Sequence, residues 1–135
     1  MSDVVDTLTV FSGARKKVYR FTNISDGTGE STVVKIDRST LTGPNGAVPT
    51  YIVIEELQWS IQGFSSVKLY WDHTADDEIV MLAPGNGVAT WVAAGGMKPP
   101  QAPSAASDGD VILTTVGAQS GATYEITMVV RLKDS

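Results

Sequence analysis

The sequence predicts an all-β protein: a single-domain antiparallel β-sandwich with a jelly-roll or related Greek-key arrangement of about 8–9 strands. Three observations carry this prediction. Short runs rich in β-branched and aromatic residues recur along the 135 residues, glycine and proline separate them, and no segment keeps a helical period. An immunoglobulin-like sandwich is the rival arrangement.

Nine segments fit the strand pattern at short intervals. The expected strands are 4–10, 15–22, 31–37, 50–62, 65–72, 78–82, 87–93, 110–116 and 123–132. The last is the clearest, because Tyr124, Ile126, Met128, Val130 and Leu132 share one parity and would line one buried face. The separators are typical of turns, such as Ser-Asp-Gly-Thr-Gly at 25–29 and Pro-Gly-Asn-Gly at 84–87.

Composition indicates one soluble globular domain over residues 1–135. Hydrophobic residues make up 42% and charged residues 19%, and no apolar run approaches the roughly 20 residues of a membrane helix. We expect a short N-terminal arm at 1–6 and long loops at 37–49 and 93–109. The start of the chain lacks the basic and apolar regions of a signal peptide, which predicts a protein made in a cytoplasm.

Charge and cysteine content exclude several classes of function. The net charge of −5 argues against a partner held by phosphate neutralisation, so we expect no nucleic acid partner. The chain has no cysteine, which removes disulfides, thiolate zinc sites and cysteine catalysis. We expect no cofactor and no membrane contact.

Two successive strands show strong alternation of apolar and polar residues. The apolar positions are Leu57, Trp59 and Ile61 in one strand and Val67, Leu69 and Trp71 in the next. We expect these strands to form a hairpin connected through 62–65, with both tryptophans in the core. The alternative is that the tryptophans form an exposed sugar platform or partner anchor.

The segment 72–78, Asp-His-Thr-Ala-Asp-Asp-Glu, is the densest in chemical groups and contains the chain's only histidine. Its spacing does not match an EF-hand loop, and one histidine cannot supply a catalytic zinc site. An enzyme would need His73 to converge in a pocket with Asp76, Asp77 and Glu78. We interpret the segment as a polar turn, and predict neither a metal site nor catalytic residues.

Two further motifs resemble functional sites only superficially. Glu55 and Glu56 are adjacent in a strand and so face opposite sides, and one of them is expected to point inward toward a partner such as Arg20 or Lys35. Gly-Asn-Gly at 85–87 does not open a helix, so it is not a phosphate-binding loop.

Several motifs together resemble the small structural proteins of tailed bacteriophages, over roughly residues 31–133. They are Val-Lys-Leu-Tyr-Trp-Asp at 67–72, Asp76 followed by Ile79, Gly-Asn-Gly at 85–87, Gly-Gly at 95–96, Gly-Asp-Val-Ile-Leu-Thr-Thr at 109–115 and Gly-Ala-Thr-Tyr-Glu-Ile at 121–126. The resemblance implies a non-enzymatic head decoration (cement) protein that binds and stabilises neighbouring major capsid subunits. It also implies a position on the capsid surface of a virion, synthesis in the bacterial host cytoplasm, and a homo-oligomer, with a trimer preferred.

A carbohydrate-binding β-sandwich module is the alternative function. It would use Trp91, Tyr70 or Tyr51 as an exposed stacking platform.

The expected contacts with a partner lie in the arm and the two long loops. Loops beyond about 12–15 residues are usually functional or disordered, and the prolines after Met97 favour an extended conformation that can lie along a neighbour. An idle insertion is the alternative. The candidate partner-binding residues are Val4, Val5, Leu41, Pro44, Met97, Lys98, Pro99, Pro100, Gln101 and Pro103.

Overall fold

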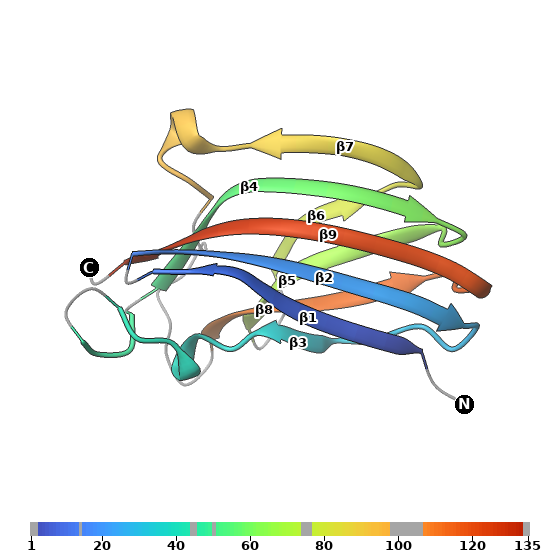
Figure 1. Ribbon diagram of the computed structural model, residues 1–135, viewed down its shortest axis with the longest axis horizontal. Coiled ribbons are helices and arrows are strands. Elements are labelled where there is room, and N and C mark those ends of the chain that lie inside the picture. The colour runs from blue at the N-terminus through green and yellow to red at the C-terminus, as the bar shows by residue number, and fades with distance from the viewer. Residues whose placement is uncertain are drawn as a thin grey trace.

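The computed structural model describes residues 3–13, 15–43, 46–49, 51–73, 77–97 and 107–133. Most of them belong to strands that form two facing sheets (Figure 1). The strands are β1 (Val4–Ser12), β2 (Lys16–Asp26), β3 (Val33–Ile36), β4 (Tyr51–Gln62), β5 (Ser66–His73), β6 (Asp77–Leu82), β7 (Gly85–Thr90), β8 (Ser107–Val116) and β9 (Ser120–Lys133). Two short 3-10 helices are η1 (Arg38–Thr40) and η2 (Val92–Ala94). Within these residues, no helix has the length and apolarity needed to cross a membrane.

The strand order is that of a jelly roll with one additional strand. The first sheet runs β1-β2-β9-β4-β7 and the second β3-β8-β5-β6, and the neighbouring strands are antiparallel. Without β1, each sheet has four strands, as in an eight-stranded jelly roll. The predicted antiparallel β-sandwich is therefore confirmed. β1 is the fifth strand of its sheet, and all of its residues are exposed.

The core lies between the two sheets because each strand alternates apolar inward residues with outward residues. The fully buried inward side chains include Phe21, Leu57, Ile126 and Met128 from one sheet, and Val67, Leu69, Trp71 and Leu113 from the other. Burying one such side chain contributes about 1.5–3 kcal/mol. This shared core holds the two sheets together.

The predicted hairpin between the strands containing Trp59 and Trp71 is wrong. β4 pairs with β9 and β7, whereas β5 pairs with β6 and β8, so the connection crosses from one sheet to the other. Gly63 has a φ of 84°, and a Cβ there would lie 2.8 Å from Cβ of Ala122. The apolar faces of the two strands thus oppose each other across the core instead of lying side by side.

The two tryptophans differ in burial. Trp71 is 2% exposed in the centre of the four-stranded sheet, as predicted for a core residue. Trp59 is partly buried, packs against the core and pairs with Gly87 in the edge strand β7. A Cβ at Gly87 would lie 2.6 Å from Cζ2 of Trp59, so the indole needs a glycine opposite it.

Several expected boundaries are corrected. Residues 4–6 belong to β1 and not to an arm, because they pair with β2. The expected loop 93–109 is shorter at both ends: Met97 forms a β-bridge with Ile54, and β8 begins at Ser107. The expected loop 37–49 contains η1.

We expect Trp71→Ala to lower the free energy of unfolding by about 3–5 kcal/mol, because it empties a buried site between the sheets. Trp59→Ala should cost clearly less, since that ring is already partly in water. Urea unfolding of both variants measures the difference. Equal losses, or a loss below about 1 kcal/mol for Trp71→Ala, would contradict this placement.

Candidate functional site

The structure divides the predicted partner-binding residues into three groups. Val4 and Val5 lie in β1 and are 68% and 42% exposed. Leu41 and Met97 are partly buried and pack against the protein's own core. Six residues lie outside the described part of the chain: Pro44, Lys98, Pro99, Pro100, Gln101 and Pro103.

β1 is a long apolar strand at the edge of a sheet. Five of its nine residues are large hydrophobic side chains that remain exposed: Val4, Val5, Leu8, Val10 and Phe11. On the outward face of the sheet, Val4 lies next to the exposed Ile24 of β2. An exposed edge of this length and composition is a template for pairing with another strand, and a contiguous apolar patch typically marks an interaction surface.

The other sheet edges carry features that discourage such pairing. β3 has four residues, β6 begins with the acidic Asp77 and Glu78, and β7 has six residues of which two are glycines. Short, charged or glycine-rich edges are poor templates for strand addition. β1 is longer, with nine residues, no glycine and a single charged residue, Asp6, and its register with β2 shifts once, between Thr9 and Phe11.

The hairpin of β1 and β2 carries opposite charges at its two ends. Arg15, Lys16 and Lys17 lie at the turn, where Ser12 pairs with Lys17. Asp3 and Asp26 lie at the other end, where Val4 pairs with Ile24. The edge therefore runs from an acidic to a basic end.

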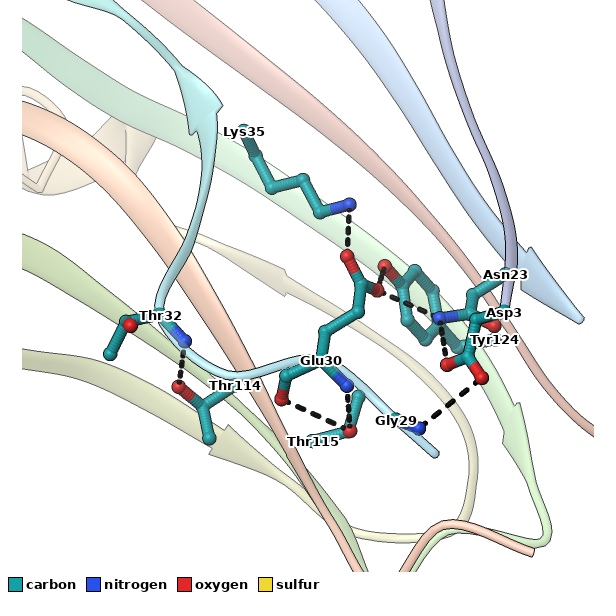
Figure 2. Close-up of polar contacts among 9 residues, drawn as sticks. All are labelled: Asp3, Asn23, Gly29, Glu30, Thr32, Lys35, Thr114, Thr115 and Tyr124. Atoms are coloured by element: carbon teal, nitrogen blue, oxygen red, sulfur yellow. Dashed lines mark hydrogen bonds and ion pairs between the residues drawn. The ribbon is translucent and has the colours of Figure 1, made fainter. Parts of the chain in front are cut away.

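A buried polar cluster closes the sandwich at the acidic end (Figure 2). Its centre is Glu30, whose Oε2 lies 2.7 Å from Nζ of Lys35 and whose Oε1 accepts hydrogen bonds from Tyr124 and, at 2.8 Å, from Nδ2 of Asn23. The Glu30 and Lys35 side chains are 5% and 2% exposed. These contacts join β2, β3 and β9 across the two sheets.

Asp3 attaches the start of β1 to this cluster. Its Oδ2 accepts a hydrogen bond of 3.0 Å from Nδ2 of Asn23, and its Oδ1 accepts three more, from Oγ of Ser25 at 3.0 Å, N of Asp26 at 3.1 Å and N of Gly29 at 3.2 Å. The amide of Asn23 thus donates to two carboxylates, while its buried Oδ1 accepts no hydrogen bond. Sequence reasoning missed this cluster, because its members are distant in the chain.

The cluster shifts two pKa values in opposite senses. Burial alone would raise the pKa of Asp3, but the hydrogen bonds from Asn23, Asp26, Ser25 and Gly29 outweigh it and lower that pKa. Burial is the largest cause that raises the pKa of the Tyr124 hydroxyl, and the hydrogen bond to the Glu30 carboxylate raises this pKa further. Tyr124 therefore acts as a hydrogen-bond donor to Glu30 over the whole range in which proteins are normally handled.

We expect Asp3 to make folding stability depend on pH. Because its pKa is lower in the folded protein, its stabilising effect is complete above the ordinary carboxyl pKa and is lost as the pH falls through the folded value. Asp3→Asn should therefore be less stable at pH 7 and lose less stability on acidification than the wild type. Urea unfolding between pH 7 and pH 3 measures this, with the exposed Asp6→Asn as control. An unchanged slope for Asp3→Asn would contradict the prediction.

Glu55 has different partners from those expected. It is buried, and it lies 3.1 Å from Nζ of Lys16 and 3.1 Å from Nε of Arg131. Arg20 pairs instead with Glu125, at 3.3 Å. The β-bulge between Ile54 and Glu56 explains the difference, because it shifts the register and turns Glu55 toward the two cations. Burial would raise the pKa of Glu55, but these partners outweigh it and lower that pKa.

The three aromatic residues named for the carbohydrate-binding alternative lie in different elements of the structure. Tyr51 starts β4 in one sheet, Tyr70 lies in β5 of the other, and Trp91 packs against the core after β7. All three are only partly exposed. Tyr51 and Tyr70 belong to different sheets, so the three do not form one row, and a platform built on any one of them stays a prediction.

Three of the seven residues of the acidic segment 72–78, residues 74–76, lie outside the described part of the chain, whereas β5 ends at His73 and β6 begins at Asp77. Its interpretation as a metal-free polar turn stays a prediction. Across the part of the chain that the structure describes, no three His, Cys, Asp or Glu residues are grouped so that they could hold a metal ion.

Comparisons with known proteins give only weak structural similarity. No family model and no curated protein matches the chain. Among solved structures, a cupin superfamily protein from Desulfitobacterium hafniense is 11% identical, with 99% of this chain and 82% of that chain covered and a TM-score of 0.39. The structure of FeII HppE is 8% identical, with 92% of this chain and 55% of that chain covered and a TM-score of 0.29.

These findings correct the resemblance to tailed-bacteriophage proteins. The similar structures are a cupin superfamily protein and FeII HppE, neither of them a virion protein, and no family model supports the resemblance. The prediction of a capsid decoration protein is therefore wrong. Its motifs lie in β5 to β9 and in the Gly-Gly segment after η2, apart from Asp76, which is outside the described residues, so they belong to the strands of a jelly roll.

A site of two histidines and one carboxylate needs two imidazoles, and this chain has one histidine. A single copy cannot supply that ligand set.

Proposed function

We propose that the protein is a non-catalytic assembly protein that forms a two-fold dimer, in which β1 of one copy pairs with β1 of a second copy. The observation that carries this proposal is the nine-residue edge strand, whose side chains are all exposed and whose large residues are apolar. Antiparallel pairing would join the two five-stranded sheets into one continuous sheet.

Such pairing would satisfy the free edge in two ways. The backbone N–H and C=O groups along the outer side of β1 would gain partners. Exposed apolar side chains such as Leu8 and Phe11 would lose contact with water, and each cross-strand pair would add about 0.2–1 kcal/mol.

The charges of the β1–β2 hairpin favour a second copy of this chain as the partner. A two-fold axis places the acidic end of one hairpin beside the basic end of the other, so Asp3 approaches Arg15 and Lys17 of the second copy. If the two-fold axis passes beside Leu8, Asp6 of one copy lies opposite Val10 of the other copy. Like charges then do not face each other across the pair of strands. The surface is thus complementary to itself.

The buried polar cluster supports the proposal by holding β1 in place before association. Asp3 connects the first residues of the strand to β2 and to the connection after it through four hydrogen bonds. A strand already fixed in an extended conformation loses less conformational entropy when it pairs.

Leu8→Lys tests the dimer, because a lysine on an edge strand discourages strand addition. We expect the wild type to sediment as a dimer and Leu8→Lys as a folded monomer. Met81→Lys, which changes an exposed side chain on β6 in the other sheet, should remain dimeric. Sedimentation equilibrium gives the mass, and far-ultraviolet circular dichroism checks that each variant is folded.

Three results would overturn the proposal. The first is a monomeric wild type at about 100 μM, a concentration at which a dimer with micromolar affinity would be almost complete. The second is a dimer that Leu8→Lys and Met81→Lys leave equally intact. The third is a closed trimer, which two-fold pairing does not form.

A further inference from the structure

A groove of about 460 Å³ crosses three strands of the five-stranded sheet, β7, β4 and β9, which lie side by side in Figure 1. Its size falls within the range of small-molecule sites, about 300–1,000 Å³. The lining residues are Gln58, Trp59, Ser60, Asn86, Gly87, Val88, Glu125 and Thr127. None of the functions considered above uses this surface.

Strand register arranges the lining side chains in two rows on the face that points away from the core. Gln58 is paired with Val88 on one side and Thr127 on the other. Ser60 is paired in the same way with Asn86 and Glu125. These positions alternate with the buried Leu57, Ile61 and Ile126, so they share the outward face.

The lining is rich in groups that both donate and accept hydrogen bonds. Gln58 and Asn86 supply planar amides, and Ser60 and Thr127 supply hydroxyls. Nε2 of Gln58 donates to Oε2 of Glu56 at 3.1 Å, which fixes the orientation of that amide at the groove. Groups of this kind, at fixed positions on a rigid sheet, match a ligand that carries several hydroxyls.

Charge and polarity limit the class of ligand. The only charged residue in the lining is Glu125, which already lies 3.3 Å from Nε of Arg20. An anion would be repelled by Glu125 and by the net charge of −5, whereas a cation would compete with Arg20. Apart from Trp59, Val88 is the only large apolar residue of the lining, so an apolar ligand would gain little.

We propose that this groove binds a neutral saccharide through hydrogen bonds from the amides and hydroxyls of β7, β4 and β9. This site differs from an aromatic platform, because its specificity comes from Gln58, Asn86 and Glu125. It does not depend on the dimer, since β2 separates β9 from the pairing edge β1 and leaves the groove open in either state.

Amide chemical shifts in ¹⁵N-labelled protein test the site directly. The probes are glucose, galactose, mannose, maltose, cellobiose and lactose, each at millimolar concentration, with glucuronate and glucosamine as charged comparisons. We expect at least one neutral sugar to shift the amides of 58–60, 86–88 and 125–127, and to bind more tightly than either charged sugar. Wild type and the monomeric Leu8→Lys should give the same result, which keeps this test separate from that of the dimer.

Variants identify the groups responsible. Gln58→Ala and Asn86→Ala should each weaken binding about tenfold, the loss expected for about 1.4 kcal/mol of hydrogen bonding. Gln62→Ala is the matched control, because Gln62 is exposed on the same strand but does not line the groove. The proposal is overturned if no neutral sugar shifts these amides, if glucuronate or glucosamine binds more tightly, or if Gln62→Ala weakens binding as much as Gln58→Ala.

Discussion

The two sheets are held together by the apolar faces that they turn toward each other. Leu57 and Ile126 on one side meet Leu69 and Leu113 on the other, and all four are essentially inaccessible to water. This packing explains why β4 and β5 do not pair despite being consecutive, since a hairpin would place both apolar faces in one sheet and leave no facing layer. It also explains why β1 is exposed, because the facing sheet has only four strands.

The polar cluster at one end of the sandwich complements this apolar core. A buried carboxylate is tolerated only when its charge and lone pairs have partners, and Glu30 obtains them from Lys35, Asn23 and Tyr124. Those partners come from different strands, so the requirement to satisfy one carboxylate holds the connection between β2 and β3 in a single position. Asp3 extends the same network to β1, whose neighbour in the sheet is β2.

The two proposed surfaces belong to the same sheet but use different properties of it. At the β1 edge, backbone groups and apolar side chains are exposed together, which favours another strand. On the outward face of β7, β4 and β9, polar side chains project from strands that are already paired, which favours a small polar ligand. The core fixes the register of β4 and β9, whereas β1 is held by its pairing with β2 and by the hydrogen bonds of Asp3, so both surfaces are formed before anything binds.

The sequence was sufficient to predict the strand content, the inward parity of β9 and the burial of Trp71, because alternation along one strand is a local property. It also limited the chemistry, since one histidine and no cysteine restrict the sites that a single copy can build. The tertiary structure was needed to show which strands pair, that residues 4–6 form an exposed edge, and that Asn23 connects Asp3 to Glu30, which Tyr124 also contacts. It likewise brought Gln58, Asn86 and Glu125 to one groove. These outcomes depend on contacts between residues far apart in the chain, and such contacts form only when the sheets bury their faces against each other.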